Sequence, residues 1–241
     1  MLYLIGLGLN EKGISLEGIE IIKKCNKIYL ENYTVDFPYS VKTLEKVIGK
    51  KIISLARVEV ESERLVNESK KENVCLLIYG CPLFATTHIS ILMDCLKNKV
   101  EYRIIYSASV FDAISESGLQ LYKFGKISSM PKWQNSYEPD SFLEFVEQNK
   151  SINAHSLILV DIGLKFEDAL KELEISSKKR NVDLNEILVC CNIGTKNSKF
   201  YYGYIECLKK KMKKISSPYC FVIPGEMHFI EKEAVERFEV K

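Results

Sequence analysis

The feature that most restricts the fold is an uninterrupted apolar run at residues 74–79, which reads Val-Cys-Leu-Leu-Ile-Tyr and ends at a Gly-Cys-Pro turn. A short run that is apolar at every position is typical of a strand buried on both faces. Such a strand belongs inside a sheet that helices cover on both sides. The sequence therefore predicts an α/β architecture.

Strand-length and helix-length segments alternate through the rest of the first half. Residues 2–7 form another apolar run, and Ser15 then precedes apolar residues at helical spacing, which predicts a capped helix. Regular alternation of this kind predicts a mostly parallel sheet. Further strands are expected at residues 27–30, 52–55 and 102–106, and helices at residues 41–48, 61–71 and 89–96, the last capped by Thr86 or Thr87.

The pattern changes after residue 111. Residues 119–125 alternate between apolar and polar side chains, and prolines then mark an irregular stretch up to residue 139. We expect a first α/β lobe at residues 1–115 and a second one, with a mixed sheet, at residues 116–241. The second lobe has apolar runs at residues 156–162, 187–191, 200–205 and 219–223, and helical segments between the first two runs and at residues 231–238.

The charge balance argues against a nucleic-acid or membrane partner. Thirty-four basic residues nearly cancel thirty-two acidic ones, so the net charge is only +2. No global positive field would then attract the chain to nucleic acid or to an anionic membrane. The lysine-rich segment at residues 209–214 has Leu208, Met212 and Ile215 at helical spacing, and we interpret it as the solvated face of a helix.

The eight cysteines predict neither disulfides nor a zinc site. There is no CxxC pair, the three histidines are far apart, and no secretory signal precedes the first strand. No apolar run reaches the roughly 18 residues that span a bilayer. We expect a soluble, cytoplasmic protein whose thiols are reduced and mostly packed in the core.

Ligands of open α/β sheets bind beyond the carboxyl ends of the strands, so the loops after those ends are the candidate sites. Gly6-Leu7-Gly8 begins like a dinucleotide-binding motif, but the third glycine is missing and Glu11 is a poor neighbour for a pyrophosphate. A P-loop, a HExxH motif and paired carboxylates are absent as well. A nucleotide-like ligand without phosphate, such as S-adenosylmethionine, fits these absences.

Three blocks of sequence resemble diphthine synthases, which belong to the tetrapyrrole-methylase-like methyltransferases. They are the opening MLYLIGLGLN, residues 80–88 (GCPLFATTH) and residues 118–126 (GLQLYKFGK). Residues 107–110, 155–162 and 223–228 extend the similarity over nearly the whole chain. The resemblance implies two α/β lobes, a cofactor cleft between them and a homodimer.

The resemblance also implies which residues bind S-adenosylmethionine. Val160 and Ile193 would equally suit a hydrophobic core, whereas Cys81 and Ser109 lie in loops at strand ends. We assign no catalytic residue and no metal ligand, because His88 and His228 are more typical of capping or packing positions. The implied cofactor-binding residues are Leu9, Cys81, Phe84, Ser109, Val110, Val160, Ile193 and Tyr219.

This sequence departs from the family pattern at three positions. Cys81 stands where an Asp is usual, Asn192 where an Arg is usual, and Tyr219 where a His is common. A charged hydrogen bond to the cofactor contributes about 1.5 to 3 kcal/mol, so the loss of the carboxylate at residue 81 is expected to weaken binding.

The resemblance implies methylation of translation elongation factor 2. The acceptor is the amino group of a 3-amino-3-carboxypropyl chain on a histidine, and eukaryotic members also methylate the carboxylate. Residues 133–142 look more like eukaryotic members. Two alternatives remain: a tetrapyrrole methyltransferase of cobalamin or sirohaem synthesis, and a non-catalytic protein that binds the elongation factor.

Overall fold

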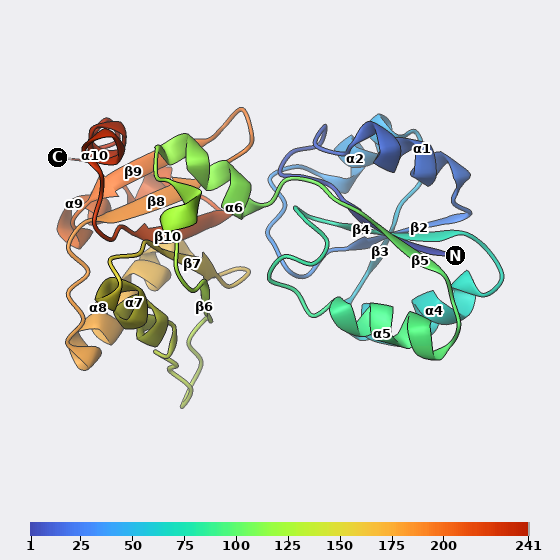
Figure 1. Ribbon diagram of the computed structural model, residues 1–241, viewed down its shortest axis with the longest axis horizontal. Coiled ribbons are helices and arrows are strands. Elements are labelled where there is room, and N and C mark those ends of the chain that lie inside the picture. The colour runs from blue at the N-terminus through green and yellow to red at the C-terminus, as the bar shows by residue number, and fades with distance from the viewer. Residues whose placement is uncertain (241) are drawn as a thin grey trace. The chain divides into compact units, whose positions relative to one another are not determined.

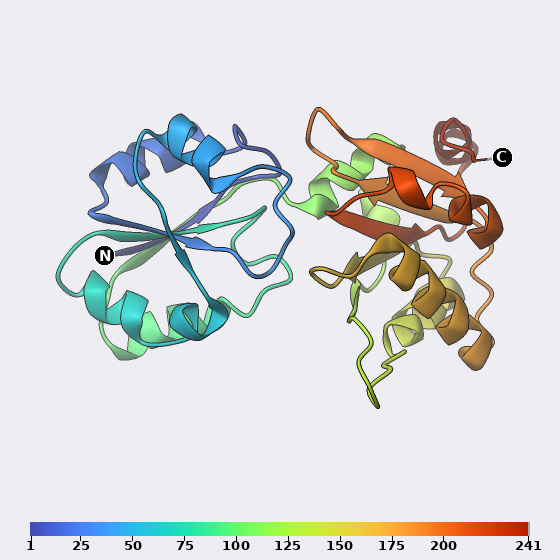
Figure 2. The same cartoon turned by 180° about the vertical axis from the view of Figure 1, so that it is seen from behind.

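The chain divides into two compact units, Met1–Val110 and the part that begins at Phe111 (Figures 1 and 2). The computed structural model describes residues 1–240. The sequence placed the boundary after residue 115. Each unit combines one five-stranded sheet with helices, which confirms the predicted α/β class.

The first unit is built on a fully parallel sheet with the strand order β3-β2-β4-β1-β5. Its central strand β4 is the apolar run identified in the sequence, and all five of its residues are buried. The five strands are β1 (Leu2–Gly6), β2 (Lys27–Glu31), β3 (Ile53–Leu55), β4 (Val74–Ile78) and β5 (Tyr102–Ile105).

Both faces of this sheet carry a hydrophobic core. Val74, Leu76 and Ile78 of β4 pack in one cluster, which includes residues of α4 and α5, whereas Cys75 and Leu77 pack in the other cluster with α1 and α2. Figures 1 and 2 show these helix pairs on opposite sides of the sheet. The helices are α1 (Leu16–Lys24), α2 (Val41–Ile48), α3 (Arg57–Val60), α4 (Arg64–Ser69) and α5 (Ile89–Lys97).

Local signals in the sequence located one helix start correctly and another wrongly. Ser15 caps α1, because its side chain accepts a hydrogen bond from the backbone N–H of Gly18 at 3.0 Å. The predicted threonine cap of α5 is wrong, since the helix begins after His88 without a side-chain cap. The Thr86 hydroxyl instead donates to the carbonyl of Pro82 at 3.2 Å, within its own loop.

The second unit contains a mixed sheet with the strand order β6-β7-β10-β8-β9, as expected. The pair β6–β7 is parallel, and the other three pairs are antiparallel. Tyr219, Phe221 and Ile223 of the central strand face the main core of this unit. The strands are β6 (Ser128–Met130), β7 (Ser156–Val160), β8 (Ile187–Cys191), β9 (Lys199–Gly203) and β10 (Tyr219–Ile223).

Helices α7 and α8 contribute most of the helical side chains in that core. The alternating segment at residues 119–125 contains a 3₁₀ turn at Leu121–Lys123. The helix expected under the lysine-rich segment is interrupted, because α9 ends at Lys209 and a separate 3₁₀ turn follows at Met212–Lys214. The helices are α6 (Val110–Ala113), α7 (Phe142–Ser151), α8 (Phe166–Arg180), α9 (Ile205–Lys209) and α10 (Phe229–Glu236).

Within residues 1–240, no helix is long and apolar enough to cross a bilayer.

The contact between Gly118 and α10 yields a test of the packing in the second unit. Gly118 has a φ of +93°, and a Cβ there would lie 2.2 Å from the Cβ of Ala234. We expect Gly118→Ala to lower the free energy of unfolding by about 2 to 5 kcal/mol, from left-handed backbone strain and overpacking. Denaturant titration would measure this loss.

Gly49→Ala is the matched control, because Gly49 has a φ of +73° and no atom lies within 4 Å of the added Cβ. It should cost only the backbone part, about 1 to 2 kcal/mol. Adding Ala234→Gly should relieve the overpacking of Gly118→Ala. Equal losses for the two single variants would contradict the predicted close contact.

Candidate functional site

Three loops follow neighbouring strands at one edge of the first sheet. Strands β4, β1 and β5 are adjacent and parallel, so their carboxyl ends lie at the same edge. The N–H of Gly8 donates to the carbonyl of Gly80 at 3.3 Å, and the N–H of Gly80 donates to the carbonyl of Gly8 at 3.0 Å. The Ser107 hydroxyl donates to the carbonyl of Gly13 at 2.8 Å. These bonds join the three loops where ligands of such sheets bind.

Glycine is required where these loops meet. Gly8 and Gly80 have φ values of +65° and +71°, which other residues rarely adopt. A Cβ on Gly6 would lie 2.6 Å from the carbonyl oxygen of Gly80. The Gly6-Leu7-Gly8 motif therefore allows the close packing of two loops.

The predicted binding residues of the first unit gather at these loops. Leu9 is buried, and its carbonyl accepts a hydrogen bond from the Tyr79 hydroxyl at 3.0 Å. Cys81 is partly exposed, and its carbonyl accepts from the N–H of Phe84 at 3.2 Å. Ser109 is buried, and its Cα lies 3.8 Å from the position of a Cβ on Gly80. Val110, the fifth predicted residue, begins α6 directly after Ser109.

The predicted residues of the second unit also share one edge of their sheet. Tyr219 is the first residue of β10 and lies opposite Cys191, the last residue of β8. Val160 ends the other neighbouring strand, β7, and Ile193 follows β8 by two positions. The antiparallel register therefore brings the three predicted residues together. Val160 packs partly buried against the core, and Ile193 is buried.

The Tyr219 side chain belongs to the core. Its hydroxyl donates to the carbonyl of Leu164 at 2.8 Å, and its ring meets Phe166 edge-on at a centroid distance of 5.5 Å. The departure from the usual His is thus accommodated by packing.

The backbone also explains the Asn at residue 192. Asn192 has a φ of +49°, a left-handed conformation that Asn adopts more readily than most residues. Its N–H donates to the carbonyl of Pro218 at 2.9 Å, and its side chain donates to the Ser216 hydroxyl at 3.2 Å. Asn192 is therefore suited to the tight turn after β8.

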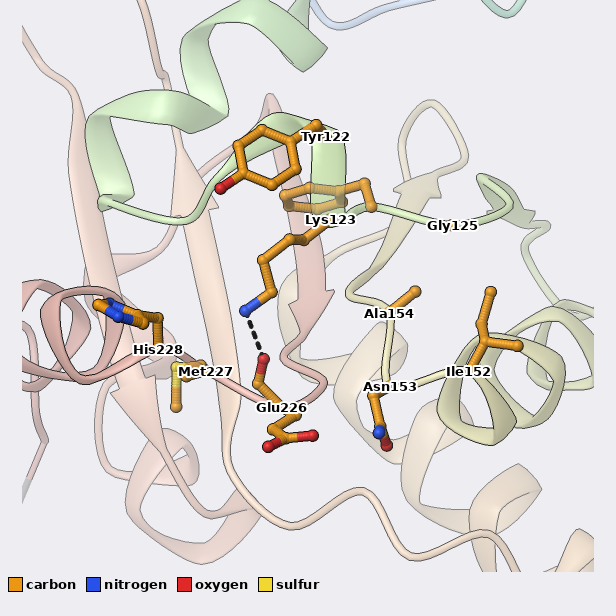
Figure 3. Close-up of a pocket in the computed structure, with 10 residues that line it drawn as sticks. Tyr122, Lys123, Gly125, Ile152, Asn153, Ala154, Glu226, Met227 and His228 are labelled. Atoms are coloured by element: carbon orange, nitrogen blue, oxygen red, sulfur yellow. Dashed lines mark hydrogen bonds between the residues drawn. The ribbon is translucent and has the colours of Figure 1, made fainter.

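A pocket of about 480 Å³ lies in the second unit and was not predicted from the sequence. Figure 3 shows that it is formed by three segments, at residues 122–125, 152–154 and 226–228. Lys123 points toward Glu226 and donates to its carbonyl at 2.6 Å (Figure 3). Two of the segments lie within blocks that carry the family resemblance, at residues 118–126 and 223–228.

A buried carboxylate holds these segments together. Glu231 accepts hydrogen bonds from the Lys123 ammonium at 2.5 Å and from His155 Nε2 at 3.1 Å. The N–H groups of Gln120 and His228 donate to it at 2.9 and 2.8 Å. Burial alone would raise the pKa of Glu231, but these hydrogen bonds lower it to about 2. The side chain is therefore a fixed negative charge that is neutralised by Lys123.

His155 is a neutral donor in this network. The N–H of Gly225 donates to its Nδ1 at 2.8 Å, so Nδ1 carries no proton, and Nε2–H donates to Glu231. Burial lowers the pKa of His155, and the opposing effect of Glu231 does not cancel it. The sequence drew attention to His88 and His228, whereas the buried His155 is the histidine that connects segments around the pocket.

Known proteins identify the family. Residues 1–208 match the family described as Tetrapyrrole (Corrin/Porphyrin) Methylases. The chain is 35% identical to the diphthine synthase of Methanococcus aeolicus, with 98% of this chain and 97% of that protein aligned. The chain belongs to the tetrapyrrole methylase family.

Two further similar proteins also carry the name of diphthine synthase or diphthine methyl ester synthase. The diphthine methyl ester synthase of Schizosaccharomyces pombe is 41% identical, over 68% of this chain and 59% of that protein. A crystal structure assigned to a diphthine synthase from Entamoeba histolytica superposes with a TM-score of 0.90 at 31% identity and covers 100% of this chain and 99% of that one. This tetrapyrrole methylase family member is accordingly an S-adenosylmethionine-dependent methyltransferase, as predicted.

The three loops of the first unit fit a nucleoside cofactor without phosphate. Residues 6–10, 80–87 and 107–110 contain no Lys or Arg that would neutralise a phosphate. The absence of basic side chains in these loops thus agrees with the cofactor of the family, which carries no phosphate.

The Glu231–His155 network predicts a pH dependence of stability. Because the pKa of His155 in the folded chain lies below its ordinary 6.5, the unfolded chain takes up the proton first. The stability is therefore complete above pH 6.5 and falls as the pH drops below that value. Glu231, with a pKa of about 2, adds a second loss below its ordinary 4.5.

We expect His155→Asn to flatten the upper part of this dependence, as the pH falls below about 6.5, in denaturant titrations at several pH values. His228→Asn is the control, since Asn is also a good N-cap for α10 and His228 is exposed. An unchanged slope for His155→Asn would show that His155 is not the titrating group.

Proposed function

We propose that this chain transfers methyl groups from S-adenosylmethionine to the amino group of a 3-amino-3-carboxypropyl-histidine on translation elongation factor 2. This reaction is a step of diphthamide biosynthesis. The observation that carries the proposal is the alignment with the Methanococcus aeolicus diphthine synthase, which extends over 98% of the chain. The neutral loops at the ends of β4, β1 and β5 support it, because they suit this cofactor.

The cofactor would be held by the joined loops of the first unit. The Tyr79 hydroxyl orients the carbonyl of Leu9, and the Gly8–Gly80 pair holds the loop that carries Cys81. Phe84 and the Ser109–Val110 pair complete this group. Val160, Ile193 and Tyr219 remain predictions from the resemblance.

Methyl transfer needs alignment more than acid–base chemistry. The cofactor supplies a sulfonium methyl group, which the lone pair of an unprotonated amine attacks in line. Orientation of two reactants is worth several powers of ten in effective concentration. The loops contribute by fixing one reactant and excluding water, so no catalytic acid or base is assigned within the described residues.

A methyl ester of the trimethylated acceptor is the second candidate product. The relative from Schizosaccharomyces pombe, at 41% identity, is a diphthine methyl ester synthase. The same site would then methylate the carboxylate of the acceptor after the amino group. Because the alignment covers only 59% of that protein, the trimethylated product remains the leading proposal.

The proposal includes a partner and a location. Elongation factor 2 is the protein substrate, and we expect a homodimer that acts in the cytoplasm. All eight cysteines are thiols, which suits a reducing compartment. Nucleic acid and membranes are not expected as partners.

The decisive assay incubates the purified chain with labelled S-adenosylmethionine and elongation factor 2 that carries the unmethylated aminocarboxypropyl histidine. Mass spectrometry of the modified peptide should show three added methyl groups, or four if the ester forms. Absence of transfer to this premodified factor, with cofactor binding intact, would contradict the proposed acceptor. Transfer to a precorrin instead would favour the tetrapyrrole reaction.

Cys81 allows a test of the cofactor position. We expect Cys81→Asp to tighten S-adenosylmethionine binding by about tenfold, because a carboxylate adds a charge-assisted hydrogen bond. Calorimetry would measure the affinity. Cys81→Ser, which adds no charge, is the matched control and should change the affinity less than about threefold. Equal affinities for both variants would argue that residue 81 does not face the cofactor.

A further inference from the structure

Two buried ionisable side chains lie next to the loop after β4, and the proposed reaction does not use them. Glu31 is the last residue of β2, the strand beside β4, and its side chain is completely buried. His88 ends the loop before α5 and is 2% exposed. Burial of a carboxyl group and an imidazole is costly unless they have partners, so their surroundings are informative.

His88 contacts the beginning of the same loop that it ends. Its Nδ1 lies 3.1 Å from the carbonyl oxygen of Pro82, which can only accept, so Nδ1 carries a proton and donates. The Thr86 hydroxyl donates to the same oxygen at 3.2 Å. Pro82 follows Cys81 directly, so His88 and Thr86 both fix the backbone next to the predicted cofactor contact.

Glu31 lies on the other side of the imidazole. One carboxylate oxygen, Oε1, accepts from the Thr34 hydroxyl at 2.6 Å and from the N–H groups of Thr34 and Tyr33 at 3.1 and 3.4 Å. The other oxygen, Oε2, is buried and has no hydrogen-bond partner among residues 1–240. His88 Nε2 lies 3.5 Å from it, and both groups are enclosed by protein.

The two elements also share a core. Tyr33, two residues beyond Glu31, and Leu83 of the loop after β4 both pack against the cluster that holds Leu76 and Ile78. A shift of His88 would therefore move the loop relative to the end of the sheet. The chain of contacts runs from β2 through Glu31 and His88 to the carbonyl of Pro82.

We propose that Glu31 and His88 are positioning residues that hold the loop at residues 81–84 in the conformation that binds S-adenosylmethionine. Glu31 orients the imidazole, and the imidazole orients the Pro82 carbonyl. Neither side chain contacts the reacting atoms. This inference rests on the proposed cofactor site in the first unit.

Two substitutions of His88 differ in whether they keep the hydrogen bond to the carbonyl of Pro82. Asn in place of His88 offers an amide N–H near the position of Nδ1 and retains a donor for Pro82, whereas Leu offers none. We expect His88→Leu to raise the dissociation constant of S-adenosylhomocysteine and the KM for S-adenosylmethionine by about tenfold or more, and kcat to change less than KM. His88→Asn should lie between His88→Leu and the wild type.

Two substitutions of Glu31 test the same role in the same way. Glu31→Gln keeps the shape and a polar group beside Nε2 of His88 and should retain most of the affinity, whereas Glu31→Leu removes that polar group and should lose affinity to a similar extent as His88→Leu. Rescue by the conservative variants excludes a general defect in folding as the cause. If His88→Leu or Glu31→Leu does not fold, His88→Asn should still bind S-adenosylhomocysteine more weakly than the wild type, and equal affinities of these two proteins would overturn the proposal.

Tyr29→Phe controls for loss of a buried hydrogen bond in the same strand. Tyr29 is buried in β2, and its hydroxyl donates to Glu68 at 2.6 Å, outside the loop after β4. This variant should lower the thermal stability while the dissociation constant of S-adenosylhomocysteine stays unchanged. An unchanged dissociation constant in His88→Leu and Glu31→Leu, with only a loss of stability, would overturn the positioning role.

Hydrogen exchange distinguishes failure of this inference from failure of the proposed function. Without any ligand, the amides of residues 83–88 should exchange faster in His88→Leu than in the wild type and in Tyr29→Phe. If the wild type binds no S-adenosylmethionine, the proposed function fails, but faster exchange would still support the loop contact. Equal exchange in all three proteins would overturn it.

Discussion

The structure of the first unit depends on the burial of β4 on both of its faces. Because every residue of this strand is apolar, the sheet needs a layer of helices on each side, and the connections between strands become crossovers that keep the strands parallel. Parallel strands place all their carboxyl ends at one edge. The loops that carry the predicted cofactor contacts therefore begin at the same edge of the sheet.

Backbone contacts join the loops at this edge. Gly8 and Gly80 exchange two hydrogen bonds, which side chains at either position would strain because both backbones are left-handed. The loops are also fixed from the side by the Tyr79 hydroxyl and by His88. A methyl transfer that works by alignment needs this kind of rigidity in the group that holds the cofactor.

The second unit organises its polar residues differently. A single buried carboxylate, Glu231, connects the segments around Lys123, His155 and Gly225, which are far apart in the sequence. A buried charge with several donors is stable only when all of them are in place. The segments that line the pocket are therefore held together by this network.

Local patterns in the sequence were sufficient for the α/β class, the parallel character of the first sheet, the mixed character of the second and the N-cap of α1 at Ser15. Apolar runs and capping residues act over a few positions, so these features need no knowledge of distant segments. A similar local pattern was misleading at Thr86, whose hydroxyl donates to the carbonyl of Pro82 within its own loop instead of capping α5. Two sets of contacts were visible only in the folded chain: Glu31 with His88, and Glu231 with the segments that it joins. These residues lie far apart in the sequence, so no local spacing predicts that they meet. The folded chain also places the Tyr219 side chain in the core, because that depends on the register of β10 against its neighbours.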